Sequence, residues 1–265
     1  MKKILKLTYF YLKVLQFTLD QVGINLLKFK NLLYFAKYFL DLIKYKRLNG
    51  KINYIFPVLG EDKKKSGRIT NHYFYQDLLV ASYIFKNKPT KHIDIGSRID
   101  GFVANVASFR KIEVFDLRIN KLNFKNIKFR TLNLNKINKK LYNYTDSISC
   151  LHTIEHFGLG RYGDKIDPDS YKKGFNNLIK MLKPNGLLYI SFPISDKNAT
   201  FFNLERRFNP KDILGWTKEL VLLNFDYIDD KQRLNLNINL LNFKKNIVNG
   251  CGIYVFKKIK INFKK

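Results

Sequence analysis

The alternation of short apolar runs with helical runs after Lys91 constrains the fold more than any other feature of the sequence. Apolar runs of strand length occupy residues 92–96, 112–117, 127–132, 147–151, 187–192, 220–228 and 252–256. Helical patterns lie between several of them, and Phe175, Leu178 and Ile179 share one face of the run at 171–182. Strands that alternate with helices predict an α/β fold with a mainly parallel sheet and helices on both faces.

The chain separates into four parts along its length. Residues 1–50 are predicted to form a basic, amphipathic helical extension, and 51–90 a connecting segment with a helix at 73–85. Residues 91–258 are the α/β domain, and 259–265 are a short basic tail. The length of 265 residues suits one such domain with additions better than two full domains.

An apolar stripe runs through the N-terminal extension. Its residues follow steps of four and three, which places them on one helical face: Val22, Leu26, Phe29, Leu33, Ala36, Leu40 and Ile43. The first fifty residues also carry ten Lys and Arg against two Asp. Three interpretations are open: the helix packs on its own domain, pairs with a second subunit, or lies on an anionic membrane surface.

The formal net charge of +28 suggests nucleic acid or an anionic membrane as a partner. Genome composition is a second explanation, because Lys, Asn, Ile, Phe and Tyr are abundant and have AT-rich codons. The basic residues are also spread along the chain, whereas nucleic-acid binders gather them on one face or stripe. Segment 191–194 (SFPI) lacks the second proline and the amide with which amino-directed nucleic-acid methyltransferases stack a base. Nucleic acid is therefore not the expected partner.

The cysteines and the apolar segments favour a cytoplasmic protein. Cys150 and Cys251 lie in apolar runs, and neither belongs to a CxxC pair or has metal-ligand spacing to a histidine. We therefore expect buried free thiols and no metal site. Lys6 and Lys13 interrupt the N-terminal apolar run, and no small-residue cleavage site follows it. Neither a secretory signal nor a transmembrane helix is expected, and peripheral membrane contact through 1–50 is left open.

A strand-turn-helix junction at 94–101 is the strongest local sign of a ligand site. Gly96 follows a buried strand, and a residue without Cβ lets the backbone approach a ligand closely. Ligands of open α/β sheets bind beyond the carboxyl ends of strands. Asp116 ends the next strand 22 residues after Asp94, close to the spacing of about 20 residues expected for a carboxylate that binds ribose hydroxyls. An ordinary tight turn and a solvated strand-end acid are the competing interpretations.

The order of four segments resembles the motif order of class I S-adenosylmethionine-dependent methyltransferases: 94–101 (DIGSRIDG), 114–118 (VFDLR), 151–158 (LHTIEHFG) and 182–191 (LKPNGLLYIS). More narrowly, residues 54–257 resemble a methyltransferase-like family of bacteria and nematodes, catalogued as domain of unknown function 268. The shared features are 73–76 (YFYQ), 93–98 (IDIGSR) and 155–164 (EHFGLGRYGD).

The resemblance implies a Rossmann-like, seven-stranded sheet whose last strand is antiparallel, with S-adenosylmethionine as the cofactor. The residues that it assigns to the cofactor are Asp94, Gly96, Ser97 and Gly101 around the methionyl part, Asp116 on the ribose and Asn133 near the adenine.

The loop 152–164 is the expected acceptor site, because it gathers two histidines, acidic residues, an arginine and a tyrosine. Methyl transfer needs mainly alignment of the nucleophile with the methyl group. A hydroxyl acceptor gains from a general base, for which histidine is the usual choice near neutral pH. The predicted catalytic residues are His156, then His152, and Asp164; the predicted acceptor-binding residues are Gln76, Glu155, Arg161 and Tyr162.

Arg161 would hold a carboxylate or phosphate of the acceptor. In a structural alternative, Glu155 and Arg161 pair and fix the loop, while His152 caps the fourth strand. The favoured function is methyl transfer to a small-molecule or sugar acceptor in surface glycan synthesis. A methyltransferase-like scaffold would instead show no turnover, and a nucleic-acid methyltransferase or binder would bind with a steep salt dependence.

Overall fold

The computed structural model describes residues 2–59, 71–118, 123–243 and 246–260. The chain divides into two compact units, residues 1–68 and 69–265. Part of the predicted connecting segment (60–70) and the end of the predicted basic tail (261–265) lie outside the described residues.

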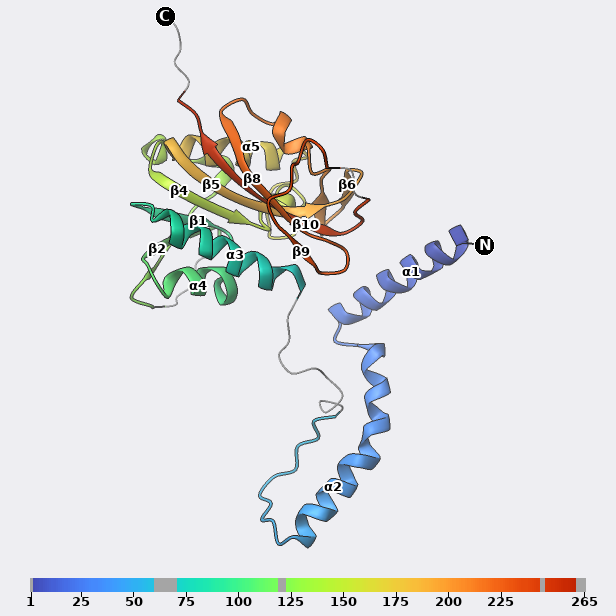
Figure 1. Cartoon of the computed structure of the whole chain (residues 1–265). Helices are drawn as coiled ribbons and strands as arrows, with labels where there is room; N and C mark the ends of the chain where they lie inside the picture. Colours follow the sequence, from blue (N-terminus) through green and yellow to red (C-terminus); the bar gives the residue numbers. More distant parts are fainter. Residues whose placement is uncertain (1, 60–70, 119–122, 244–245, 261–265) are drawn as a thin grey trace, which may run out of the picture. The chain divides into compact units, whose positions relative to one another are not determined.

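Helical segments make up most of the N-terminal unit (Figure 1): α1 Lys2–Gln21, the 3-10 helix η1 Leu26–Tyr34 and α2 Phe35–Arg47. Gly23, with a φ of 82°, ends α1, and the amide of Ile24 donates to the carbonyl of Leu19 (2.9 Å). The side chain of Asn25 caps η1, because it accepts from the amide of Lys28 (3.1 Å). The stripe predicted on one continuous helix therefore spans a turn, a 3-10 helix and α2.

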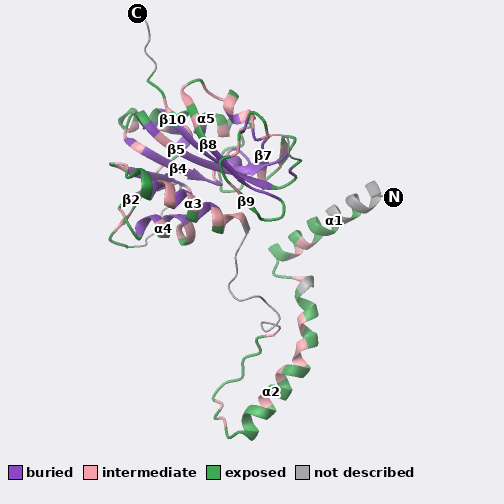
Figure 2. Cartoon of the chain, viewed as in Figure 1, coloured by how far each residue is buried: buried purple, intermediate pink, exposed green. Residues whose placement is uncertain are grey.

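Side-chain burial separates the N-terminal unit from the rest of the chain. Of its side chains at positions 8, 11–26 and 28–59, which are those described, none is buried (Figure 2). No helix in the described part of the chain is both long and apolar enough to cross a membrane.

An eight-stranded sheet forms the centre of the second unit, in the order β3-β2-β1-β4-β5-β10-β8-β9. Its strands are β1 His92–Ile95, β2 Ile112–Asp116, β3 Ile127–Thr131, β4 Thr145–Leu151, β5 Leu182–Ile194, β8 Leu220–Ile228, β9 Leu234–Asn235 and β10 Gly250–Lys258. The first five are parallel, and β10 runs antiparallel between β5 and β8, as predicted for the last strand. A separate two-stranded sheet contains β6 Ala199–Phe201 and β7 Glu205–Arg207.

The predicted number of seven strands is wrong by one, because of β9. After β8, the amide of Asp229 donates to the carbonyl of Arg233 (3.0 Å) and turns the chain back. The two residues of β9 then pair with Tyr227 and Ile228. A strand this short has no alternating apolar pattern by which the sequence could reveal it.

Helices cover both faces of the sheet (Figure 1). The elements on one face are α3 Asn71–Asn87, the π-helical turn η3 Ile99–Val103 and α4 Ala104–Ala107, and α5 Ser170–Met181 covers the other. Val80 and Ile84 of α3 pack with Tyr189, whereas Leu178 of α5 packs with Ile190. Strand β5 is thus buried on both faces, which explains its continuous apolar sequence. Short 3-10 turns are η4 Leu134–Lys136, η5 Lys139–Leu141, η6 Ile154–His156 and η7 Asp212–Gly215.

The parallel register brings the carboxyl ends of β1, β2 and β4 to one edge of the sheet. Ile95 of β1 lies beside Phe115 of β2, and Asp94 lies beside Ser149 of β4. The amide of Gly96 donates to the carbonyl of Phe115 (2.9 Å), which keeps the chain at this edge just beyond β1. The edge is where ligands bind in sheets of this kind.

A side chain from β10 closes the end of α5. The helix ends at Met181, and β5 begins at once with a bulge over 183–186, the turn predicted from the Lys-Pro-Asn-Gly sequence. The Nζ of Lys258 donates to the carbonyls of Ile179 (2.7 Å) and Leu182 (2.8 Å). An ammonium group at this position satisfies terminal carbonyls and complements the helix dipole.

Replacing Lys258 with Met is expected to lower the free energy of unfolding by about 1–3 kcal/mol, because the methyl thioether keeps the apolar stem but loses both charge-assisted hydrogen bonds. Chemical denaturation measures this effect. Lys172→Met is the control, since the exposed Lys172 on the same helix pairs with Asp169 at the surface. Equal stability of both variants would show that Lys258 does not hold the end of α5.

Candidate active site

A buried carboxylate organises the turn after β1. Asp94 accepts hydrogen bonds from the amide and hydroxyl of Ser97 (3.0 and 2.6 Å) and from the hydroxyl of Ser149 (2.5 Å). The Ser97 hydroxyl in turn accepts from the amide of Leu151 (3.1 Å). Burial raises the pKa of Asp94 to about 6, against the opposing effect of these hydrogen bonds. Asp94 and Ser97 therefore tie the turn to the end of β4.

Gly96 has a backbone conformation and a neighbour that both require glycine. Its φ is 69°, and a Cβ at this position would lie 2.6 Å from the side-chain methyl of Thr153. Gly101 is also tightly enclosed, but by the carboxylate of Asp77 on α3. Gly96 thus brings bare backbone to the sheet edge, whereas Gly101 allows η3 to pack on α3.

Two adjoining cavities lie at this edge, with volumes of about 1000 and 490 Å³. The residues that line both are Gly96, Asp116, Arg118, His152, His156 and Tyr162. The larger cavity, here called the outer cavity, also has Ser97, Tyr73, Arg98, Arg161 and Glu205 in its wall. The smaller, here called the inner cavity, adds Phe115, Leu132, Asn133, Thr153 and Asp164. Both volumes suit a small-molecule site.

Asp116 is held by the chain that follows it. Its Oδ1 accepts from the amide of Arg118 (2.8 Å) and lies 3.4 Å from the Nε of the same residue. The Arg118 guanidinium in turn lies over the ring of Tyr162, 4.5 Å from its centroid. Both contacts of Asp116 with described residues use Oδ1, so Oδ2 can accept hydrogen bonds from a ligand. In the inner cavity, Asn133 begins η4, because its side chain accepts from the amide of Asn135 (3.0 Å).

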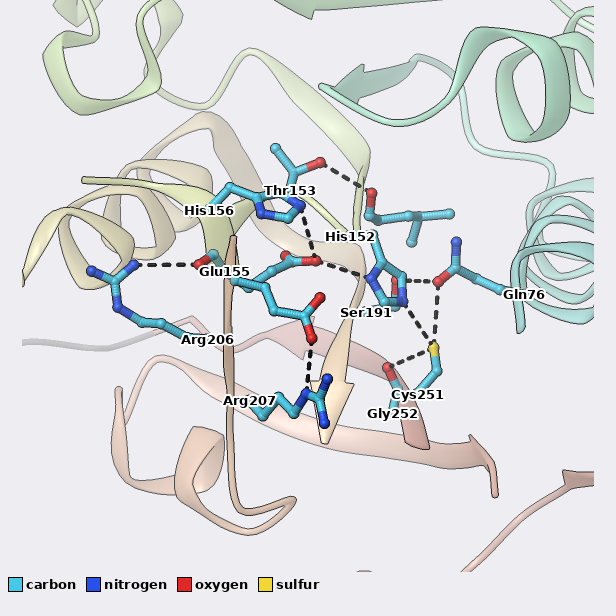
Figure 3. A network of polar contacts seen from close by, with 12 residues as sticks. Gln76, His152, Thr153, Glu155, His156, Ser191, Arg206, Arg207, Cys251 and Gly252 are labelled. Atoms are coloured by element: carbon cyan, nitrogen blue, oxygen red, sulfur yellow. Dashed lines mark hydrogen bonds and ion pairs between the residues drawn. The ribbon is translucent and has the colours of Figure 1, made fainter. Parts of the chain in front are cut away.

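Two histidines that line the cavities lie close to a buried carboxylate, and Figure 3 shows the three side chains together. The Oε1 of Glu155 lies 2.9 Å from the Nδ1 of His152 and 3.7 Å from the Nε2 of His156. Neither oxygen of Glu155 has a partner of full hydrogen-bonding geometry among the described residues. Burial raises the pKa of Glu155 to about 7 and lowers that of His152 to about 4. Glu155 is fully buried and lines neither cavity.

His152 adopts a strained backbone conformation directly after β4, with a φ of 48°. Its ring stacks on His72, with centroids 4.4 Å apart, and its Nε2 lies 3.3 Å from the Sγ of Cys251. Burial lowers the pKa of His72 to about 3. The two stacked imidazoles are therefore neutral near neutral pH, which avoids repulsion between buried cations.

The orientation of His156 is fixed by the chain before β7. Its Nδ1 donates to the carbonyl of Leu204 (2.6 Å), since a carbonyl oxygen can only accept. In the neutral ring, Nε2 then carries the lone pair. Arg161 donates to the same carbonyl through Nη1 (3.1 Å). Arg161 therefore contacts Leu204, in place of the pair with Glu155 that the structural alternative predicted.

Asp164 and Gln76 have contacts that hold the protein together. Asp164 accepts from the amides of Gly158 (2.5 Å) and Tyr162 (3.3 Å), which closes the loop on itself. Gln76 accepts from the hydroxyl of Ser191 (2.6 Å; Figure 3) and lines neither cavity. Asp94 and Gly101 line neither cavity either, while Asp164 borders the inner one.

Several cavity residues were missed by the sequence analysis. Arg118 stands two residues after Asp116, and this closeness was the signal that both side chains line the same cavities. Tyr73 was assigned to the helix 73–85 without a role, but its ring lines the outer cavity. The guanidinium carbon of Arg98 lies over this ring, 4.8 Å from its centroid. Cys251 lies beside His152 although 99 residues separate them, so no local pattern could have indicated the contact. Both cysteines are free and buried, as predicted.

Comparison with known proteins identifies a family and a fold. The sequence model described as "Caenorhabditis protein of unknown function, DUF268" matches residues 99–252, more than half of the chain. No curated protein matches the sequence.

Two solved structures have a similar fold. The 1,6-didemethyltoxoflavin-N1-methyltransferase of Burkholderia thailandensis, with bound 1,6-didemethyltoxoflavin and S-adenosylhomocysteine, matches with a TM-score of 0.51 and 12% identity, over 71% of this chain and 79% of that one. The 4+2 cyclase SpnF matches with a TM-score of 0.50 and 10% identity, over 69% of this chain and 81% of that one. The second unit thus has the Rossmann-like fold of class I methyltransferases. One of the two similar proteins is named for another reaction, so the site and not the fold must carry the functional argument.

The buried Glu155 predicts a specific pH dependence of stability. Burial raises its pKa from 4.5 to about 7, so the folded protein binds this proton more tightly than the unfolded chain. The stabilisation by the proton is complete below pH 4.5 and is lost as the pH rises through about 7. Chemical denaturation of the wild type and of Glu155→Gln at pH 4 to 8 tests this. The free energy of unfolding of the wild type, relative to that of the variant, should fall as the pH rises from 4 to 8. A difference that stays constant would contradict the raised pKa of Glu155.

Proposed function

The chain belongs to the DUF268 family, and we propose that it transfers a methyl group from S-adenosylmethionine to a small-molecule or sugar acceptor. The observation that carries this proposal is the pair of adjoining cavities that meet at Gly96, Asp116 and His156. The inner cavity combines apolar walls with a carboxylate and bare backbone, as a nucleoside requires. The outer cavity combines aromatic and basic side chains, as a polar acceptor with an anionic group requires.

The residues at the sheet edge fit S-adenosylmethionine. The Oδ2 of Asp116, which has no partner among the described residues, can accept hydrogen bonds from vicinal ribose hydroxyls. Phe115 and Leu132 give the inner cavity apolar surface for the adenine, with the amide of Asn133 beside them. Gly96 leaves space for the methionyl part, because any Cβ there would fill the gap toward Thr153. Asp94, Ser97 and Gly101 support the turn, and Ser97 also lines the outer cavity.

When bound, S-adenosylmethionine supplies an electrophilic methyl group on a sulfonium. The protein must then align the acceptor and remove its proton. His156 is the proposed base, because its ring lines both cavities and its Nδ1 is committed to Leu204, which leaves Nε2 to take a proton. Glu155 lies 3.7 Å from this nitrogen, outside direct hydrogen bonding but close enough to stabilise the imidazolium. His152 has the role of positioning Glu155, and Asp164 that of shaping the loop.

Arg161 is the proposed anchor of the acceptor. Arg98 and Arg118, the other arginines of the outer cavity, pair with Asp100 and Asp116. Arg161 has a backbone carbonyl as its partner, and no carboxylate lies within ion-pair distance of it in the described part of the chain. An acceptor with a carboxylate or phosphate would supply the missing charge. Tyr162 lies beside Arg161 in the cavity wall, and an anionic sugar held by this arginine would be consistent with a role in surface glycan synthesis.

A non-catalytic scaffold is the second candidate, and Arg98 is the observation that favours it. Arg98 stands in the turn after Gly96 and forms a two-point ion pair with Asp100 at the outer cavity (3.2 and 3.0 Å). This pair occupies space beside the proposed methionyl position. The spread of basic residues and the unsuitable 191–194 segment disfavour the nucleic-acid alternative.

Isothermal titration calorimetry with S-adenosylmethionine separates the enzyme from the scaffold. The wild type is expected to bind, and Asp116→Ala is expected to raise the Kd about ten- to hundredfold, because hydrogen bonds to a charged group contribute roughly 1.5–3 kcal/mol. Asp169→Ala is the control, since Asp169 is exposed at the start of α5. A wild type without affinity supports the scaffold, and an unchanged Kd in Asp116→Ala would refute the ribose contact.

Replacing the proposed base, His156, should reduce turnover but leave the binding of S-adenosylmethionine intact. His156→Gln keeps a donor for the carbonyl of Leu204 but removes the basic nitrogen, so kcat is expected to fall about 100-fold or more. The measurement is transfer of labelled methyl groups to small molecules extracted from the native cell. Calorimetry on the same variant checks that S-adenosylmethionine still binds. Turnover within twofold of the wild type would exclude His156 as the base.

A further inference from the structure

The N-terminal unit exposes an unusual amount of apolar surface. Val22, Leu33 and Leu40 are 71, 82 and 67% exposed, and no described side chain between positions 8 and 59 is buried. Helices of a folded protein normally bury an apolar face, and exposed apolar surface of this extent marks a binding site for a protein or a membrane.

The helix α2 has the side-chain arrangement of an interfacial helix. At 100° per residue, Phe35, Phe39 and Ile43 share one side, while Lys37 and Lys44 lie on the opposite side. The last turn adds two further basic positions, Lys46 and Arg47. Exposed aromatic rings accompany these residues throughout the unit: Tyr11, Phe17, Phe29, Phe39, Tyr45, Tyr54 and Phe56. Aromatic and basic side chains around an apolar stripe are typical of helices at the headgroup level of a bilayer.

The charge of this segment departs from that of the remaining chain. Residues 1–50 carry ten Lys and Arg against two Asp, whereas the rest carries 39 basic against 19 acidic residues. A uniform compositional bias explains the abundance of lysine in both parts. It does not explain why acidic residues are so scarce in the first fifty positions.

We propose that residues 2–47 bind the surface of an anionic lipid bilayer, with α1 and α2 lying in the plane of the interface. Pairing with a second copy would bring two segments of like charge together, with only Asp20 and Asp41 to form ion pairs between them. A bilayer of anionic lipids supplies the opposite charge and an apolar layer at once. Lys13 and the basic residues near both helix ends make insertion across the bilayer unfavourable. None of the described helices is long and apolar enough to cross a membrane.

Flotation of the full chain with lipid vesicles tests this proposal. Vesicles of phosphatidylcholine with phosphatidylglycerol should bind the protein at low salt. Pure phosphatidylcholine vesicles should bind it at least tenfold more weakly. Raising the salt should release it from the anionic vesicles, because charges at a surface are screened over about 8 Å at physiological ionic strength. Each of Lys44→Gln, Lys46→Gln and Arg47→Gln should weaken binding about fivefold.

Matched apolar-to-acid substitutions locate the contact. Leu33→Asp and Leu40→Asp are each expected to reduce binding to anionic vesicles at least tenfold. Leu223→Asp is the control, because Leu223 is similarly exposed but lies on β8 of the second unit, and it makes the same change of charge. Circular dichroism on all three checks that the second unit is folded.

Three results would overturn the proposal. The first is absence of binding to anionic vesicles, and the second is equal loss of binding in Leu40→Asp and Leu223→Asp. The third is a dimer of the wild type in sedimentation velocity that Leu40→Asp dissociates, because the apolar face would then belong to a second copy. None of these measurements depends on methyl transfer, so failure of the proposed function would leave the outcome unaffected.

Discussion

The carboxylate of Asp94 is the constraint on which the proposed site depends. It is fully buried, and burial of an unsatisfied carboxylate would be severely unfavourable. Three hydrogen bonds, from the amide and hydroxyl of Ser97 and the hydroxyl of Ser149, satisfy it. These partners lie on the turn after β1 and on β4, so one charge fixes the turn against the strand that leads into the loop 152–164. Gly96 and His152 are placed at the sheet edge as a consequence.

A second set of contacts closes the loop that follows β4. The carbonyl of Leu204 accepts hydrogen bonds from both His156 and Arg161, and Asp164 accepts from two amides of the same loop. Arg206 adds to this by donating to the carbonyls of Glu155 and Phe157. The loop is therefore held from the β6–β7 side as well as from β4. Residues whose side chains face the cavities owe their orientation to a segment about 50 positions later in the chain.

The strand-turn pattern predicted which residues lie at strand ends, but no local pattern indicated the contacts between distant positions. Asp94, Gly96 and Asp116 follow directly from the strand-turn pattern, and each is found at the sheet edge. Gln76, predicted to touch the acceptor, contacts Ser191, which is 115 positions away. The apolar periodicity could not reveal this pairing, because it reports only which face of a helix is buried. The short strand β9 escaped for the related reason that two residues form no pattern.

The buried carboxylate of Glu155 offsets the charge that would form if the proposed base took up a proton. A proton taken from an acceptor by a solitary buried histidine would create a cation in an apolar environment, which is unfavourable. Beside an ionised Glu155, the same proton neutralises the pair, and the buried charge of the site does not grow. Burial raises the pKa of Glu155 to about 7, so part of the protein carries an ionised Glu155 near neutral pH, 3.7 Å from the Nε2 of His156. His152, kept neutral by burial, contributes no competing cation. In the proposed mechanism, Glu155 would therefore compensate the charge that forms when His156 takes the proton of an acceptor.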